Sequence, residues 1–90
     1  MKKLFEKNIK YKSDEHGEYI DVCGEVINVE MVKTVFVTNK CIVTINTKDF
    51  GSIAGIAYSA PQIGYTATIR VYRNNGNDYT DNELRSWEGK

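Results

Sequence analysis

The stretch from Tyr19 to Arg73 has the pattern of β-strand along nearly its whole length. Short runs rich in valine, isoleucine, threonine and tyrosine alternate apolar with polar residues, and turn residues separate them, which is typical of half-buried strands. The predicted strands are, in chain order, Tyr19–Met31, Thr34–Thr38, Cys41–Thr47, Ser52–Tyr58 and Tyr65–Arg73. Five short strands in so small a chain predict a mainly β fold whose sheet closes into a barrel.

The chain has 90 residues, which is the size of one domain. We place the core of this domain at residues 18–73 and a C-terminal tail at residues 77–90. A domain this short buries only about two-thirds of the surface that its unfolded chain exposes, so its margin of stability is thin. We therefore expect a small five-stranded antiparallel barrel that either closes its own sheet or relies on a partner.

The first predicted strand changes the parity of its apolar residues. Val22 and Val26 occupy even positions, whereas Val29 occupies an odd one. A slip of one residue turns every following side chain to the opposite face of a sheet. A bulge or bend is therefore expected between Gly24 and Ile27.

The later strands have regular patterns. Asn39 and Lys40 form a two-residue connection that suits a tight hairpin, because asparagine tolerates positive φ. The inner face of that hairpin would consist of Val35, Val37, Cys41, Val43 and Ile45. In the last strand, Tyr65, Ala67, Ile69 and Val71 share one face, and Thr66, Thr68, Arg70 and Tyr72 share the other.

The two ends of the chain have weaker patterns. Near the N-terminus, Leu4, Phe5 and Ile9 fit the spacing of a short amphipathic helix, and an edge strand over residues 8–12 fits equally well. In the tail, Thr80 and Glu83 have the spacing of a capping box, and Leu84 and Trp87 stand three residues apart. The tail therefore predicts a short helical turn.

The charges cancel overall, with 12 lysines and arginines against 12 acids. They are unevenly placed, since residues 1–12 carry five lysines against one glutamate, and residues 13–30 carry six acids and no lysine or arginine. A folded molecule would then have a basic and an acidic face, while its net field favours no class of ligand. No run of apolar residues resembles a secretory signal or a membrane span, so the expected compartment is the cytoplasm.

The residues that usually carry chemistry are few. The single histidine, His16, lies in a polar turn without a neighbouring nucleophile, and the glycines do not form a phosphate-binding loop. Cys23 and Cys41 lack a zinc-site or disulfide-framework pattern, and we expect both to be small buried residues. We therefore predict a protein that is not an enzyme, without cofactor, metal site or small-molecule substrate.

Aromatic and basic residues on the outward parity of the strands give the most specific signal. Single-stranded nucleic acid needs flat faces for base stacking and cations for the backbone. The candidate nucleic-acid-binding residues are Phe36, Lys40, Arg70, Tyr72 and Arg73. The alternative for Tyr72 is packing beneath the N-terminal segment or the tail, since tyrosine is common in strands for packing alone.

A long first strand with a glycine bend at Gly24, a hairpin and two further strands resembles the five-stranded small barrels. The OB-fold is the first choice and the SH3-like barrel the second, and the resemblance covers about residues 18–73. OB-folds usually carry a helix between strands three and four, whereas here only Lys48–Gly51 separates them. The OB resemblance implies ligand binding across the second and third strands, at Phe36, Lys40, Ile42 and Thr44.

Two functions follow from these patterns. The leading prediction is a small β-barrel that binds nucleic acid, most narrowly single-stranded. The competing prediction is a protein-interaction module or inhibitor, of the kind that phages and mobile elements encode, which adds a strand edge or presents Tyr79 and Trp87 to its partner. Homo-oligomerisation through an exposed edge is a third alternative.

Overall fold

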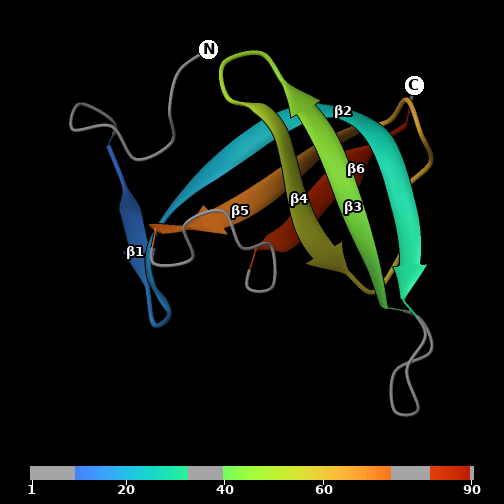
Figure 1. Cartoon of the computed structure of the whole chain (residues 1–90). Coiled ribbons are helices and arrows are strands. Elements are labelled where there is room, and N and C mark those ends of the chain that lie inside the picture. The colour runs from blue at the N-terminus through green and yellow to red at the C-terminus, as the bar shows by residue number, and fades with distance from the viewer. Residues whose placement is uncertain (1–9, 33–39, 74–81, 90) are drawn as a thin grey trace.

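The computed structural model describes residues 10–32, 40–73 and 82–89, which contain strands and no α-helix (Figure 1). The strands are β1 (Lys12–Asp14), β2 (Gly17–Val32), β3 (Lys40–Thr47), β4 (Gly51–Ala57), β5 (Thr66–Tyr72) and β6 (Glu83–Glu88). Turns occupy residues 15–16 and 48–50, and Gly17 and Gly51 follow them at positive φ, 122° and 74°. Both turns lie where the sequence predicts them.

Five of the strands form a closed ring in the order β2, β3, β4, β6, β5 and back to β2. The junctions are antiparallel except the one between β4 and β6, which is parallel and consists of the single pair Ile56 and Glu83. β1 lies outside the ring and pairs with the start of β2. The prediction of a mainly β fold is confirmed. A closed ring of five strands is present, but β6 is one of them although its residues were predicted as a helical turn, and the ring is not antiparallel throughout.

β2 holds the ring together because it pairs with two neighbours. Residues 19–25 pair with β5, and residues 24–32 pair with β3. The register against β3 shifts between Val26 and Asn28, so Ile27 is an extra residue. This bulge brings both Val26 and Val29 opposite the buried residues Ile45 and Val43. The predicted bulge between Gly24 and Ile27 is confirmed.

The core lies inside the ring. Its buried residues are Val22, Val26, Cys41, Val43, Ile45, Ala57, Ala67, Ile69 and Val71. These belong to every strand of the ring except β6, which adds the partly buried Leu84. Each large aliphatic side chain buried in this way contributes about 1.5–3 kcal/mol relative to an exposed one. The alternation predicted for β3 and β5 is confirmed over these residues.

Two glycines let neighbouring strands approach one another. A Cβ atom on Gly24 would lie 2.3 Å from the carbonyl oxygen of Asn46 on β3. A Cβ atom on Gly55 would lie 2.8 Å from Cγ2 of Ile69 on β5. Only glycine avoids these overlaps, so its absence of a side chain is what permits the bend of β2 and the close contact of β4 with β5.

Asn82 closes the ring between β4 and β5. Its backbone oxygen accepts a 2.8 Å hydrogen bond from the N–H of Ile56. Its side-chain Nδ2 donates to the oxygen of Ala54 at 3.2 Å, and its Oδ1 accepts from the N–H of Tyr72 at 3.4 Å. The residue is 5% exposed, so these partners replace water for a buried amide.

The predicted helical turn in the tail is wrong, because Glu83–Glu88 is the strand β6. The register with β5 shifts between Thr68 and Ile69, which leaves Arg85 as an extra residue and places Leu84 opposite Ile69 and Trp87 opposite Ala67. A spacing of three residues therefore brings two apolar side chains to one face of a bulged strand, as it would on a helix. Thr80 lies outside the described residues.

The prediction that Lys40 belongs to a hairpin turn is also wrong, because Lys40 pairs with Val32 in the β2–β3 ladder. Asn39, the other predicted turn residue, lies outside the described residues. The partner of β3 is the far half of β2, and the residues predicted as the second strand, 34–38, lie outside the described residues. The same holds for residues 1–9. An edge strand does precede the first turn, at Lys12–Asp14.

Candidate functional site

Arg70, one of the five predicted nucleic-acid-binding residues, is enclosed by carboxylates. Its Nε donates to Oδ1 of Asp21 at 3.0 Å, its Nη2 donates to Oδ2 of the same residue at 3.3 Å, and its Nη1 lies 3.5 Å from Oδ2 of Asp14. The guanidinium carbon lies 3.8 Å from the ring centre of Tyr19. These hydrogen bonds to Asp21 raise the pKa of Arg70, whose side chain is only 17% exposed.

Tyr72 has the predicted outward parity but is buried. Its hydroxyl donates to Oδ2 of Asp14 at 2.7 Å, and its ring meets those of Tyr19 and His16 edge to face. Burial and the hydrogen bond to Asp14 raise the pKa of Tyr72. Residues of the β1–β2 hairpin thus cover this face of β5, so the Tyr72 ring is packed and is not an open stacking platform. These ring contacts come from the hairpin, whereas the packing alternative named the N-terminal segment or the tail.

Asp14 is held in its charged form by this cluster. Burial acts against the carboxylate, but hydrogen bonds from the Tyr72 hydroxyl and from the N–H of His16, together with the nearby His16 and Arg70, lower the pKa of Asp14 below its usual value. The His16 bond is 2.8 Å long. The group of Asp14, Tyr19, Asp21, Arg70 and Tyr72 is called the hairpin lock below.

Arg73 is half-exposed, and its charge is also matched. Its Nη1 lies 3.4 Å from Oε1 of Glu18, and its guanidinium carbon lies 5.1 Å from the ring centre of Tyr11. Such an exposed pair is weak and competes little with a ligand. Of the two predicted arginines, only Arg73 therefore presents its cation to solvent.

The remaining predicted residues do not join this group. Lys40 pairs with Val32 at the end of β2, whereas Tyr72 pairs with Tyr19 near its start, and roughly 40 Å of strand separates these two positions. Figure 1 shows β5 ending beside β1 and β3 beginning on the opposite side of the molecule. Phe36 and Tyr79 lie outside the described residues. The structure thus brings Arg70 and Tyr72 together, places Arg73 next in the chain with other partners, and leaves Lys40 apart.

Three of the four residues implied by the OB resemblance share a surface, and the fourth, Phe36, lies outside the described residues. Lys40, Ile42 and Thr44 are half-buried, and they alternate along β3 with the fully buried Cys41, Val43 and Ile45. Ile56 of β4 pairs directly with Ile42, and Ala54 pairs with Thr44. This outward face of β3 and β4 is therefore mostly apolar, with one cation at its border.

A second surface was not predicted as a unit. The exposed large hydrophobic residues of the described chain are Ile27 (42% exposed), Met31 (53%), Tyr58 (61%), Ile63 (66%) and Trp87 (38%). Trp87 was predicted as a partner-binding residue, but the other four were not predicted. We call these five residues the apolar end.

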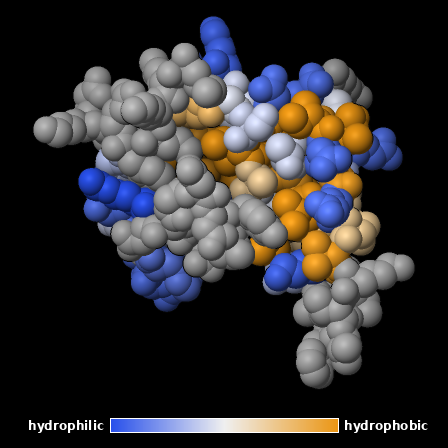
Figure 2. Space-filling model, viewed as in Figure 1, coloured by the Kyte–Doolittle hydropathy of each residue, from blue (hydrophilic) through white to orange (hydrophobic). Residues whose placement is uncertain are grey.

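The ladders place these residues around the connection between β4 and β5, residues 58–65. Ile27 follows Val26, whose N–H and oxygen bond to Tyr65 and Gly64, next to Ile63. Met31, Cys41 and Ala57 form one row across β2, β3 and β4, and Tyr58 continues from Ala57. Figure 2 shows apolar residues spread over the half of the visible face that β2, β3 and β4 occupy. An isoleucine in a polar loop, Ile63, is the signal that could have found this surface.

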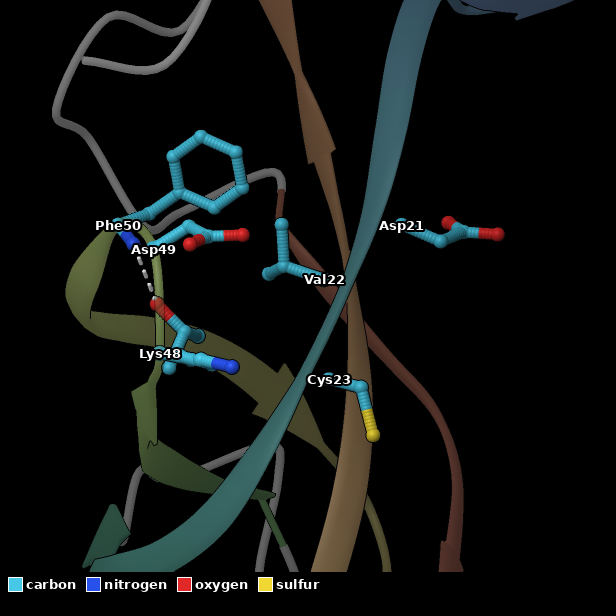
Figure 3. Close-up of a pocket in the computed structure, with 7 residues that line it drawn as sticks. Asp21, Val22, Cys23, Lys48, Asp49 and Phe50 are labelled. Carbon is cyan, nitrogen blue, oxygen red and sulfur yellow. Dashed lines mark hydrogen bonds between the residues drawn. The ribbon is translucent and has the colours of Figure 1, made fainter. Parts of the chain in front are cut away.

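A small pocket lies between β2 and the turn at residues 48–50 (Figure 3). It has a volume of about 160 Å³ and is lined by Asp21, Val22, Cys23, Thr47, Lys48, Asp49 and Phe50. Figure 3 shows Val22, Asp49 and Phe50 on one side of β2, with Asp21 and Cys23 directed away. The Thr47 hydroxyl is engaged by the N–H of Phe50 and the oxygen of Gly51. The groups facing this pocket thus do not include a nucleophile beside a base.

The two cysteines differ. Cys41 is fully buried, and burial raises the pKa of its thiol, whereas Cys23 is exposed, so the prediction that both are buried is wrong for Cys23. The alternation of side chains along β2 explains the exposure of Cys23, because its neighbours Val22 and Gly24 occupy inward positions and Cys23 therefore points outward.

In the described ranges, no cluster of histidine, cysteine and acidic side chains could hold a metal ion. No helix there is long and apolar enough to cross a membrane. Comparison of the chain with protein-family models, with curated proteins and with solved structures found no match.

Proposed function

We propose that this chain is a non-enzymatic binding module whose ligand is a protein, held at the apolar end. The observation that carries the proposal is the exposure of five large apolar side chains on or beside residues 58–65. Tyr58 and Ile63 lie in that connection, Ile27 and Met31 lie on the part of β2 next to its two ends, and Trp87 stands opposite Ala67, just after it. Exposed apolar residues that form one group, rather than scattered singly, are typical of a protein-interaction surface. Tryptophan and tyrosine are also the residues that most often dominate binding energy at such surfaces.

The hairpin lock also supports a protein ligand over a nucleic acid. Phosphate binding needs cations that are available, but Arg70 is enclosed by Asp14 and Asp21. A phosphate group would have to displace carboxylates that already make charge-assisted hydrogen bonds. Tyr72 cannot stack with a base unless the β1–β2 hairpin leaves it.

Single-stranded nucleic acid is the second candidate ligand, and the order of the strands in the ring supports it. β6 lies between β4 and β5, so the five strands have a Greek-key order rather than a simple meander. We propose that the ring is a small barrel of the OB type, in which oligonucleotides lie across the second and third strands. In this chain that surface would be the outward face of β3 and β4, with Lys40, Ile42 and Thr44. An SH3-like barrel is the second choice.

Titration of labelled single-stranded DNA, single-stranded RNA and duplex DNA, followed by fluorescence anisotropy, separates the two candidates. Binding to phosphates weakens steeply as salt rises, because counterions are released. The protein-binding proposal predicts no binding of any of the three at low salt. Binding that falls with salt and is weakened by Lys40→Ala, but not by Ile63→Ser, would favour the nucleic-acid candidate instead.

A further inference from the structure

One edge of β6 has no strand beside it in the described chain. β6 pairs with β5 from Glu83 to Glu88, but it pairs with β4 only at Glu83. β4 ends at Ala57, one residue beyond that pair, while β6 continues for five more residues. The backbone groups of Leu84–Glu88 on this side therefore form an open edge, and such an edge is a template for another extended chain.

This edge is accessible on both of its faces. Arg85, Ser86, Trp87 and Glu88 are all exposed. Trp87 is 38% exposed, although it stands opposite Ala67, which is 1% exposed and belongs to the core. An inward-facing tryptophan beside a buried alanine would be covered if a further strand lay next to β6. Trp87 thus extends the apolar end onto the inner face of the open edge.

The outer face beside this edge carries one acid, Glu88, that no described cation matches. The ladders align Asp21, Arg70 and Glu83 in one row across β2, β5 and β6, and Glu25, Thr66 and Glu88 in another. Arg70 lies against Asp21, and Nη1 of Arg85 lies 3.0 Å from Oε2 of Glu83. The carboxylate of Glu88 has no cation within 4.0 Å among the described residues. A strand added here would meet apolar contacts on its inner face and the carboxylate of Glu88 on its outer face.

A second copy of the chain fits this edge poorly. If two β6 strands paired antiparallel with Leu84 of one opposite Trp87 of the other, Glu83 would stand opposite Glu88. Like charges directly opposite one another destabilise a pair of strands. The complementary occupant is a chain with basic residues in place of these acids.

We infer that the partner of the apolar end supplies an extended segment in which apolar and basic residues alternate, and that this segment pairs with the open edge of β6. Side chains of a strand point to opposite faces in turn. Every second residue would therefore contact Leu84 and Trp87, and the alternate residues would face Glu83, Ser86 and Glu88. The inference rests on the proposed function and names the class of partner for the same surface.

The test uses the full chain and a synthetic peptide in which lysine and valine alternate. A peptide with the same composition, but with its lysines and valines in two separate blocks, is the control for charge and hydrophobicity. Amide hydrogen exchange and chemical shifts are followed by NMR, together with the fluorescence of Trp87, the only tryptophan. The alternating peptide should bind, slow the exchange of amides within residues 84–88 and shift the Trp87 emission. The control peptide, with its lysines and valines in separate blocks, should do none of these.

Two charge-reversal variants decide whether the charge of Glu88 takes part. Glu88→Lys should weaken binding of the alternating peptide by about tenfold, which corresponds to about 1.4 kcal/mol. Glu30→Lys makes the same change at an exposed position of β2 that is opposite Ile42 of β3, and it should leave binding unchanged. Equal binding of both peptides, equal effects of both variants, or amide protection away from β6 would overturn the inference.

The remaining outcomes separate the inference from the proposed function. Sedimentation that shows a dimer whose β6 amides are protected without peptide would assign the edge to a second copy and overturn the inference. If peptides selected from a random library require Ile63 and Trp87 but leave the β6 amides unprotected, the proposed function stands and the added strand is wrong. If no peptide of any pattern requires these residues, the proposed function is wrong as well.

Discussion

The hydroxyl of Tyr72 donates a 2.7 Å hydrogen bond to Oδ2 of Asp14, which joins the end of β5 to the hairpin that precedes the ring. The two residues are 58 positions apart in the chain. Together with the contacts of Arg70 to Asp14 and Asp21, this bond fixes β1 against the ring. The side chains that looked suited to nucleic acid are thus used to hold the fold.

Removing this hydroxyl should destabilise the protein. Tyr72→Phe keeps the ring and its packing but leaves Asp14 without its shortest hydrogen bond. The free energy of unfolding in urea should fall by about 0.5–1.5 kcal/mol, the usual contribution of one hydrogen bond. Tyr65→Phe is the matched control, because no hydrogen bond from the Tyr65 hydroxyl to another described residue was found, and it should change stability little. Equal losses in both variants would contradict the hairpin lock.

The same carboxylate predicts a dependence on pH. The pKa of Asp14 is lowered from its usual 3.8 in the folded state, so the folded state prefers the charged form. This contribution is present above the unfolded pKa and is lost as pH falls through the lower folded value. Asp14→Asn should therefore be less stable than the wild type at neutral pH. The difference should shrink below pH 3.8, as measured by urea unfolding at stepwise lower pH. A difference that is constant with pH would rule out a role for this charge.

Gly24 should tolerate no side chain. In Gly24→Ala the new Cβ would lie 2.3 Å from the Asn46 oxygen, which belongs to a backbone held in the β2–β3 ladder. Overpacking of this kind costs about 1–3 kcal/mol. Gly89→Ala is the control, since its Cβ would meet only the ring of Tyr65, at 3.1 Å, and a side chain can move aside. Unfolding midpoints that fall by the same amount in both variants would contradict the proposed close approach.

The two thiols should react at very different rates. Cys23 is exposed, whereas Cys41 is fully buried and donates to the oxygen of Ala57 at 3.4 Å. A thiol reagent should modify one cysteine rapidly in the native protein and the second only on unfolding, because the thiolate is the reactive form and burial disfavours it. Mass spectrometry of the labelled peptides identifies the site. Rapid labelling of Cys41 would show that β3 and β4 open readily.

The strand pattern could be predicted from the sequence because period-two alternation follows directly from the geometry of a strand. The bulge near Ile27 could be predicted for the same reason, since Val26 and Val29 have opposite parity but face one core. The strand β6 could not be predicted from the sequence, because the bulge at Arg85 gives Leu84 and Trp87 the spacing of a helix. A local pattern does not distinguish these two cases until the partner strand is known.

The candidate site was harder to predict than the fold. Outward parity gave Arg70 and Tyr72 the position of ligand-binding residues, but parity does not show which hairpin covers them. The carboxylates that neutralise Arg70 come from Asp14 and Asp21, which lie about fifty residues earlier in the chain. The apolar end likewise depends on the ladders that bring Ile27, Ile63 and Trp87 to one place.

The most direct test of the proposed function is selection of peptides from a displayed random library on the immobilised wild-type protein. Each selected peptide is then measured against Ile63→Ser, which removes the most exposed residue of the apolar end, and against Asn46→Ser, an exposed position near the far end of β3. We predict that Ile63→Ser weakens binding by about tenfold or more while Asn46→Ser leaves it unchanged. Peptides that bind both variants as tightly as the wild type would contradict the assignment of the apolar end as the protein-binding surface.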